Sequence, residues 1–157
     1  MEQKFTLGVG GAVVRDGRLL LVHHTYGAKK WQMPGGYVKL HECAHEGVVR
    51  EVYEETGIRA KVDGLLGVRH RVNEGDNSTY LIFKMTPIDL CEPTPDGREV
   101  DEARYFTLDE IEALPPQVPA LNVWVARRVL GSGAPILLLD HGDPEGLNRP
   151  YNLYLHP

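Results

Sequence analysis

The chain has 157 residues, of which 42% are hydrophobic and 25% are charged, and its formal net charge is −5. This length and composition fit one globular domain with a core of its own rather than two domains. The acidic balance argues against a surface that coats a nucleic-acid polymer, because such proteins usually carry a basic face. Any phosphate group that this protein handles must therefore meet positive charge locally.

Cysteine usage and the N-terminal sequence indicate the compartment. Cys43 and Cys91 lie far apart, without the close Cys or His spacing that predicts a zinc site. Reduced thiols are the simpler interpretation. The first residues lack the features of a secretory signal, and no apolar run reaches membrane-spanning length. We therefore expect a cytoplasmic protein with no membrane partner.

The first elements are predicted to form a hairpin. Residues 5–15 and 18–25 have the pattern of strands, and Asp16-Gly17 between them is a strong turn signal because both residues tolerate positive φ. A polar loop over 26–32 leads to the sequence MPGG, whose proline and glycines exclude a helix. The pattern over 42–56 is helical, and Gly57 supplies the stop expected just past a helix end.

The remaining elements alternate irregularly between strands and helices. We expect strands over 58–71, 80–86 and 103–106, with a loop over 73–79, and helices over 108–114 and 119–130. This order predicts a layered α/β domain rather than a doubly wound parallel sheet.

The chain is expected to divide into a domain over 1–130 and a C-terminal extension over 131–157. The run PILLLD could add an edge strand to the domain. The extension either packs on the domain or forms an arm at a homodimer interface.

One helix gathers carboxylates. Glu51, Glu54 and Glu55 are spaced i, i+3 and i+4, so they fall within one arc of the helix surface. Arg50 precedes Glu54 by four residues and can pair with it. Like charges on one face destabilise a helix unless a cation lies between them, and hard oxygen ligands suit Mg²⁺ or Mn²⁺. A solvated acidic face is the alternative for such a run taken alone.

The surrounding residues decide between these alternatives. The segment 36–58 reads GYVKLHECAHEGVVREVYEETGI and matches the Nudix box at every defined position: Gly36, Glu42, Arg50, Glu51, Val52, Glu54, Glu55, Gly57 and Ile58. So many constrained positions at fixed spacing make a chance match very rare. The chain thus resembles the Nudix hydrolase family, and more loosely so from the first hairpin through WQMPGG to YFTLDEIEAL.

The resemblance implies a Nudix-type α/β/α sandwich with a mixed sheet, and it assigns roles by matching position. Glu51, Glu54 and Glu55 would bind Mg²⁺, for which Mn²⁺ can substitute. Glu42 would be an auxiliary carboxylate, and Arg50 would orient the cluster. The backbone at Gly36 would approach the metal or a phosphate oxygen, which explains why a side chain is unwelcome there.

The implied reaction is hydrolysis of a diphosphate linkage. Metal ions neutralise the diphosphate and make hydroxide available near neutral pH. A carboxylate then removes the proton from the water, and the candidates are a box glutamate such as Glu54 or Glu51, or a loop glutamate, with Glu102 ahead of Glu99. A solvated loop is the alternative for the last two.

Substrate contacts are expected from basic and aromatic residues near the box. Lys29 and Lys30 can pair with phosphate, and Trp31 can stack on a base, although a core anchor is the alternative for Trp31. Arg69 and Arg71 lie in a segment that looks like the corresponding one in relatives accepting NADH or ADP-ribose. Asn122 could bond a purine, as a comparable asparagine does in enzymes that remove oxidised nucleotides.

The predicted partner is thus a small nucleotide derivative, of the ADP-ribose, NADH or nucleotide-sugar type, whose two halves are linked by a diphosphate. Two alternatives remain open: a pyrophosphatase that removes unwanted (d)NTPs, and a Nudix domain without activity that senses a ligand. The complete carboxylate set favours an enzyme, because a sensor has no need of it.

Overall fold

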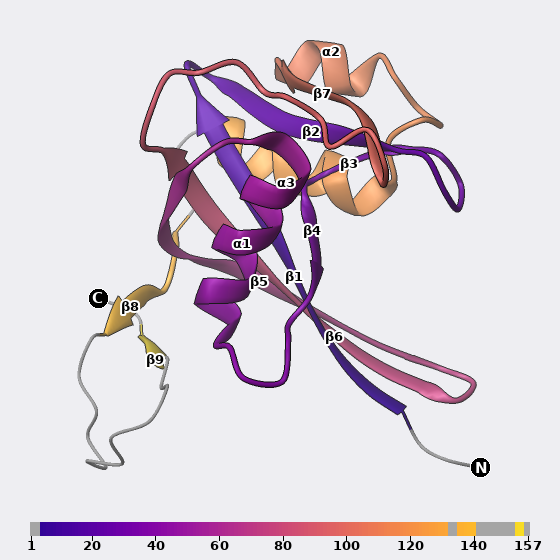
Figure 1. Ribbon diagram of the computed structural model, residues 1–157, viewed down its shortest axis with the longest axis vertical. Coiled ribbons are helices and arrows are strands. Elements are labelled where there is room, and N and C mark those ends of the chain that lie inside the picture. The colour runs from indigo at the N-terminus through magenta and orange to yellow at the C-terminus, as the bar shows by residue number, and fades with distance from the viewer. Residues whose placement is uncertain (1–3, 132–134, 141–152, 156–157) are drawn as a thin grey trace.

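The computed structural model describes residues 4–131, 135–140 and 153–155. In chain order, the elements are β1 (Lys4–Arg15), β2 (Arg18–His24), β3 (Trp31–Gln32), β4 (Gly35–Tyr37), α1 (Ala44–Thr56), β5 (Ala60–Asn73), β6 (Asp76–Pro87), β7 (Val100–Phe106), α2 (Leu108–Glu112), α3 (Ala120–Leu130), β8 (Leu138–Asp140) and β9 (Leu153–Leu155). Figure 1 shows their arrangement.

The main sheet is mixed, as predicted. Its strand order is β3-β2-β1-β6-β5, with β4 also paired to β1 and β7 to β2. Strand β1 runs parallel to β6 from the pair Lys4↔Asp76 to the pair Val13↔Met85, whereas its pairings with β2 and β4 are antiparallel. The sheet thus brings β4, which carries the two glycines of MPGG, to the middle of the molecule beside β1.

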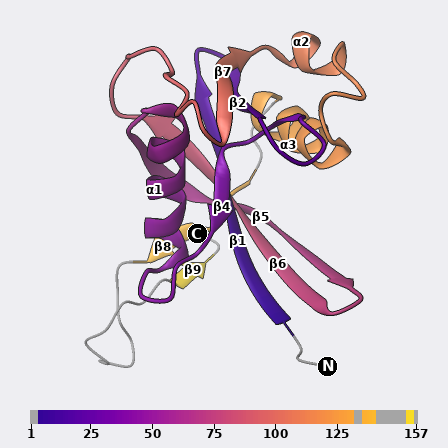
Figure 2. The same cartoon turned by 45° about the vertical axis from the view of Figure 1, so that its right-hand side comes forward.

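Helices cover both faces of this sheet, which confirms the α/β/α sandwich. Figure 2 shows α1 on one side and α2 with α3 on the other. The core under α1 contains Val48, Val52 and Phe83, and the core under α3 contains Phe106 and Ile111, all buried. The β5–β6 hairpin and the start of β1 extend past the end of α1 (Figure 2).

Helix α1 begins and ends where its sequence predicts. Glu46 accepts a hydrogen bond of 2.9 Å from the main-chain N–H of Cys43, which caps the first turn. Gly57 takes the left-handed conformation, with φ of 68°, and its N–H bonds the carbonyl of Tyr53 at 2.8 Å. The observed helix starts two residues later than the predicted start at residue 42.

The predicted loop over 73–79 is wrong. Strands β5 and β6 continue to Asn73 and from Asp76, joined by a tight turn in which Gly75 has φ of 78°. The polar stretch stays extended because each of its residues from Asp76 pairs with β1 on one side and β5 on the other. Strand β7 is likewise longer than predicted, since it pairs along most of β2.

The described part of the C-terminal extension packs on the domain. Leu137 exchanges two main-chain hydrogen bonds with Leu65 of β5, at 2.8 and 3.0 Å. The ring of Tyr154 lies 5.5 Å from that of Phe83. The run PILLLD does form a strand, β8, but it pairs with β9 in a separate two-stranded sheet. Within the described ranges, no helix is long and apolar enough to cross a membrane.

Candidate active site

Arg50 connects three carboxylates at the surface of α1. Its Nε and Nη2 donate to the two oxygens of Glu42, and its Nη1 donates to Glu51 at 2.7 Å and to Glu54 at 3.1 Å. The pair with Glu54 is the predicted i,i+4 contact. The hydrogen bond from Arg50 holds the pKa of Glu42 at about 2, well below its usual value, although burial opposes this shift. Arg50 is therefore fixed in place by a carboxylate that stays ionised.

Both carboxylate oxygens of Glu42 accept hydrogen bonds from the protein. Besides Arg50, its Oε1 accepts a hydrogen bond of 2.8 Å from the main-chain N–H of Lys39. Gly47 lies one turn along the helix, and a Cβ added there would come within 3.1 Å of the same oxygen. The glycine thus makes room for Glu42, whose position suits the fixing of Arg50 better than the binding of an ion.

Glu55 lies deeper than the other two box glutamates. Glu55 is 2% exposed, and its Oε2 accepts a hydrogen bond of 3.0 Å from the N–H of Gly35. The Nε2 atom of His24 lies 3.6 Å from its other oxygen. Burial raises the pKa of Glu55, while His24 and the Gly35 N–H act in the opposite direction. The arc of carboxylates therefore runs from the solvent at Glu54 to the interior at Glu55.

The two glycines of β4 let its backbone come close to these carboxylates. A Cβ added to Gly36 would lie 2.6 Å from the carboxylate carbon of Glu51, and one added to Gly35 would lie 2.1 Å from the carbonyl oxygen of Val9. No side chain fits at either position. The strand therefore presents bare backbone to the face of α1 that carries Glu51 and Glu55.

These residues fit a divalent ion by donor type and placement. Carboxylate oxygens are the ligands that Mg²⁺ and Mn²⁺ prefer, and glycine at position 36 leaves beside Glu51 the space that a Cβ would fill. In the described part of the chain, no three His, Cys, Asp or Glu side chains are already gathered closely enough to share an ion. Glu51, which lies beside Gly36, and Glu54 are both paired with Arg50, so an ion that they shared would have to compete with this arginine.

Glu99 and Glu102, both expected in a loop, lie in different surroundings. Glu102 is in fact in strand β7, where it lies opposite His23 of β2 in the backbone pairing. The next residue of β2, His24, approaches Glu55. The carbonyl of Glu99 accepts from the N–H of Thr25, next to Tyr26. Burial first, and then the charges of Glu55 and Glu99, raise the pKa of Tyr26. The ring of Tyr26 also stacks on that of His24, with centroids 5.0 Å apart, so Glu99 is linked to Glu55 through Thr25, Tyr26 and His24.

Strands β3, β5 and β6 and the start of α3 contribute to a cleft of about 360 Å³. The residues that line it are Gln32, Met33, Arg69, Arg71, Tyr80, Pro119, Leu121 and Asn122. It brings together the two predicted arginines. The amide oxygen of Asn122 accepts a hydrogen bond of 2.9 Å from the N–H of Met33, which fixes this buried side chain at the cleft wall.

The other predicted substrate residues lie elsewhere. Trp31 packs edge-on against Phe106, with ring centres 4.8 Å apart, so the structure supports the core-anchor alternative. Lys29 and Lys30 precede it in the loop and do not line the cleft. The structure therefore separates them from the arginines with which the sequence analysis grouped them.

Tyr80 was missed by the sequence analysis, yet it connects the cleft to the carboxylates. Its ring lies across β1, where a Cβ on Gly8 or Gly10 would clash with it, at 2.9 and 2.0 Å. Its hydroxyl would be 3.1 Å from a Cβ on Gly35, and its other face is covered by the guanidinium of Arg69, 5.4 Å away. Glycines at alternate positions of a strand were the signal that a large side chain crosses it.

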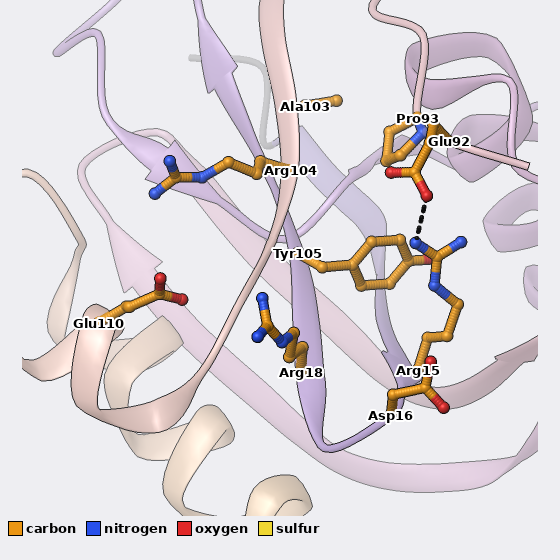
Figure 3. Close-up of a pocket in the computed structure, with 9 residues that line it drawn as sticks. All are labelled: Arg15, Asp16, Arg18, Glu92, Pro93, Ala103, Arg104, Tyr105 and Glu110. Atoms are coloured by element: carbon orange, nitrogen blue, oxygen red, sulfur yellow. Dashed lines mark hydrogen bonds and ion pairs between the residues drawn. The ribbon is translucent and has the colours of Figure 1, made fainter.

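A second hollow, of about 670 Å³, lies at the β1–β2 turn and β7 (Figure 3). Its walls carry the arginines Arg15, Arg18 and Arg104 together with the acids Asp16, Glu92 and Glu110. Arg15 is bonded to Glu92 at 2.9 Å, as Figure 3 shows. No predicted site residue lines this hollow, and its charges balance.

Comparison with known proteins agrees with this geometry. The family model described as the NUDIX domain matches residues 4–127. A MutT-like protein of Streptomyces ambofaciens is 37% identical over 119 residues, which cover 75% of this chain and 74% of the relative. A diphosphoinositol polyphosphate phosphohydrolase of Mus musculus is 32% identical, with coverage of 77% and 74%. An ADP-ribose pyrophosphatase of Methanocaldococcus jannaschii is 32% identical, with coverage of 69% and 65%.

Solved structures show the same fold. The MutT NUDIX hydrolase of Burkholderia pseudomallei superposes with a TM-score of 0.69 at 27% identity, covering 81% of this chain and 99% of that one. The MutT protein of Methanosarcina mazei gives a TM-score of 0.68 at 25% identity, with coverage of 82% and 94%. The residues matched by the family model include α1 with its carboxylates and β4 with its two glycines. The chain therefore belongs to the Nudix family and is a hydrolase that acts on phosphorus anhydrides.

Proposed function

We propose that this protein is a Mg²⁺-dependent pyrophosphohydrolase that cleaves the diphosphate linkage of a nucleoside diphosphate derivative. The observation that carries this proposal is the placement of the Glu51 and Glu55 carboxylates against the bare backbone of Gly35-Gly36, with a cleft adjoining them across Tyr80. The carboxylates suit an ion that binds a diphosphate, and the cleft suits the moiety attached to it.

The chain's own residues divide the work of the reaction. A bound divalent ion would neutralise the diphosphate and lower the pKa of a water molecule. Glu51, Glu54 and Glu55 would hold it, and Arg50, itself fixed by Glu42, would orient the first two. We assign the removal of the water proton to Glu99 ahead of Glu102, because the Glu99 main chain bonds Thr25, next to the Tyr26 ring that stacks on His24 beside Glu55.

The charge distribution favours a linked diphosphate. The chain is acidic overall, and Lys29 and Lys30 do not line the cleft, so a third phosphate in line with the diphosphate would have to reach Arg69 and Arg71, which lie over the ring of Tyr80 and along the cleft wall. The similarity to an ADP-ribose pyrophosphatase supports the same class. Cleavage of such a compound releases two monophosphates.

A (d)NTP pyrophosphatase is the second candidate, and one observation favours it. Asn122 lines the cleft, and its amide orientation is fixed by Met33, so its Nδ2 is left to donate to a base. A relative named as MutT-like is consistent with it. A sensor without activity is disfavoured, since every carboxylate of the box is present.

A panel of substrates tests the proposal. It comprises ADP-ribose, NADH, nucleoside diphosphate sugars, dinucleoside polyphosphates, and normal and oxidised dNTPs, each with Mg²⁺. We expect the highest kcat/KM for a diphosphate linked to a second moiety, with two monophosphates as products. A dNTP that releases pyrophosphate with the highest kcat/KM would replace the proposal with the second candidate.

A further inference from the structure

Two arginines share one wall of the cleft. Arg69 and Arg71 occupy alternate positions of β5, so their side chains leave the same face of the sheet. Across the antiparallel pairing they lie opposite Tyr80 and Ser78 of β6. All four side chains therefore lie on the face that carries the cleft, and both arginines line it.

Arg69 has bonding capacity that the protein does not use. Its Nη2 donates to the hydroxyl of Ser78 at 3.3 Å, and its guanidinium lies over the ring of Tyr80. Its Nε is buried and has no acceptor among the described residues. A buried donor without an acceptor costs free energy, and this cost would be removed if the side chain turned toward a ligand that supplies the acceptor.

The charge of the two arginines is also uncompensated. Neither forms an ion pair with a carboxylate in the described ranges, whereas Arg50 contacts three carboxylates and the arginines of Figure 3 share their hollow with three acids. In a chain of net charge −5, two adjacent cations without a counter-ion on a cleft wall point to an anionic ligand.

The arginines and the carboxylates lie at different parts of the Tyr80 side chain. The hydroxyl of Tyr80 lies near Gly35, beside the carboxylates, while its ring lies under Arg69. The phenol ring therefore separates the arginines from the carboxylates that would position the diphosphate. The group that meets Arg69 and Arg71 belongs to the moiety in the cleft.

We propose that Arg69 and Arg71 bind a phosphate monoester carried by the substrate's cleft-bound moiety, apart from the diphosphate linkage. A guanidinium matches phosphate because two of its N–H groups can donate to two oxygens in parallel. The substrate class is thus a diphosphate-linked nucleoside derivative with an additional phosphate on a ribose. This inference rests on the proposed function.

Matched substrates that differ by one phosphate test the inference. The pairs are NADPH with NADH, and coenzyme A with dephospho-coenzyme A. We expect the phosphorylated member of at least one pair to exceed its partner in kcat/KM by about tenfold or more, as hydrogen bonds to a charged group provide. The pair that shows the preference identifies the ribose position that carries the phosphate.

Variants assign that preference to the arginines. Arg69→Met keeps an unbranched side chain without charge and should reduce the ratio of the two kcat/KM values toward one; Arg71→Met should reduce it less, because Arg71 is the more exposed. Arg18→Met, in the other hollow, should keep the wild-type ratio. An unchanged ratio in Arg69→Met, or no wild-type preference in either pair, overturns the inference.

A binding measurement separates this inference from the proposed function. Without metal, calorimetry should show tighter binding of adenosine 2′,5′-bisphosphate or adenosine 3′,5′-bisphosphate than of AMP, and Arg69→Met should abolish the difference. Absence of metal-dependent hydrolysis throughout, with this binding difference intact, rejects the proposed function alone. Hydrolysis of linked diphosphates with equal binding of the bisphosphates and AMP rejects the inference alone.

Discussion

The main-chain N–H of Gly35 donates a 3.0 Å hydrogen bond to the buried carboxylate of Glu55 and so joins β4 to α1. Glu55→Gln keeps an acceptor for this bond and removes a carboxyl group whose pKa is raised by burial. We expect hydrolysis to fall by about 10²-fold or more, since the substitution removes a carboxylate that we propose to bind the metal. The free energy of unfolding without metal should stay equal or rise, because the buried charge is gone.

Two measurements check this prediction: steady-state kinetics at saturating Mg²⁺, and urea unfolding in the presence of a chelator. Glu54→Gln is the matched variant at the exposed end of the arc, and it should also lose activity with its fold intact. Full activity in Glu55→Gln would remove that residue from the site.

Substitution of Gly36 tests the close approach of β4 to the helix. In Gly36→Ala, the new Cβ would lie 2.6 Å from the carboxylate carbon of Glu51, which must therefore shift. A displacement of this size in an active site can lower kcat by about 10²-fold. Gly67→Ala is the control, because Gly67 is also in a strand and its Cβ would meet nothing within 4 Å. Equal activity of the two variants would show that a shift of the Glu51 carboxylate does not affect the reaction.

The general base can be assigned by comparing Glu99 with Glu102. Glu99 is linked to Glu55 through Tyr26, which stacks on His24, whereas Glu102 of β7 lies opposite His23 in the backbone pairing. We expect the loss of kcat in Glu99→Gln to exceed that in Glu102→Gln by about tenfold, within the range that general-base catalysis contributes. Single-turnover kinetics measure both. A larger loss in Glu102→Gln would restore the assignment made from the sequence.

Asp96 holds the loop that carries Glu99. Its Oδ1 accepts hydrogen bonds from the N–H groups of Arg98, Glu99 and Val100, at 2.8, 3.0 and 3.0 Å. Burial by itself raises the pKa of Asp96, but these three bonds outweigh it and hold the pKa below the ordinary 3.8. Because the folded-state pKa is lowered, the carboxylate stabilises the fold above pH 3.8, and this contribution is lost as the pH falls below that value.

We therefore expect Asp96→Asn to lower the free energy of unfolding by about 0.5–1 kcal/mol at neutral pH, a small value since the group is exposed. The difference from the wild type should shrink as the pH falls below 3.8. Urea unfolding at several pH values gives both quantities, with Asp16→Asn as the control at a turn. A difference that grows in acid would contradict the sign of the pKa shift.

The parts of the fold that depend on local chemistry could be predicted from the sequence. The turn at Asp16-Gly17, the end of α1 at Gly57 and the contact between Arg50 and Glu54 all join residues close in the chain. Each follows from backbone freedom or from helix spacing. The family resemblance supplied the fold class, which the sheet and its two helical layers confirm.

The relationships that were missed join distant segments. Tyr80 reaches the carboxylates because β6 pairs in parallel with β1, more than seventy positions earlier, and no local pattern states that register. His24 of β2 likewise approaches Glu55 of α1, and the two residues belong to separate elements whose packing no local pattern predicts. Trp31 was ambiguous for the same reason, since its partner Phe106 lies far along the chain.

The most direct test of the proposed reaction is one measurement of metal-dependent product formation. The protein is freed of metal with a chelator, and the best linked diphosphate of the panel is added with increasing Mg²⁺. Products are separated by ion-exchange chromatography. We predict no hydrolysis until Mg²⁺ is present, and then equal amounts of two monophosphates. Hydrolysis without a divalent ion, or the absence of monophosphates at saturating Mg²⁺, would contradict it.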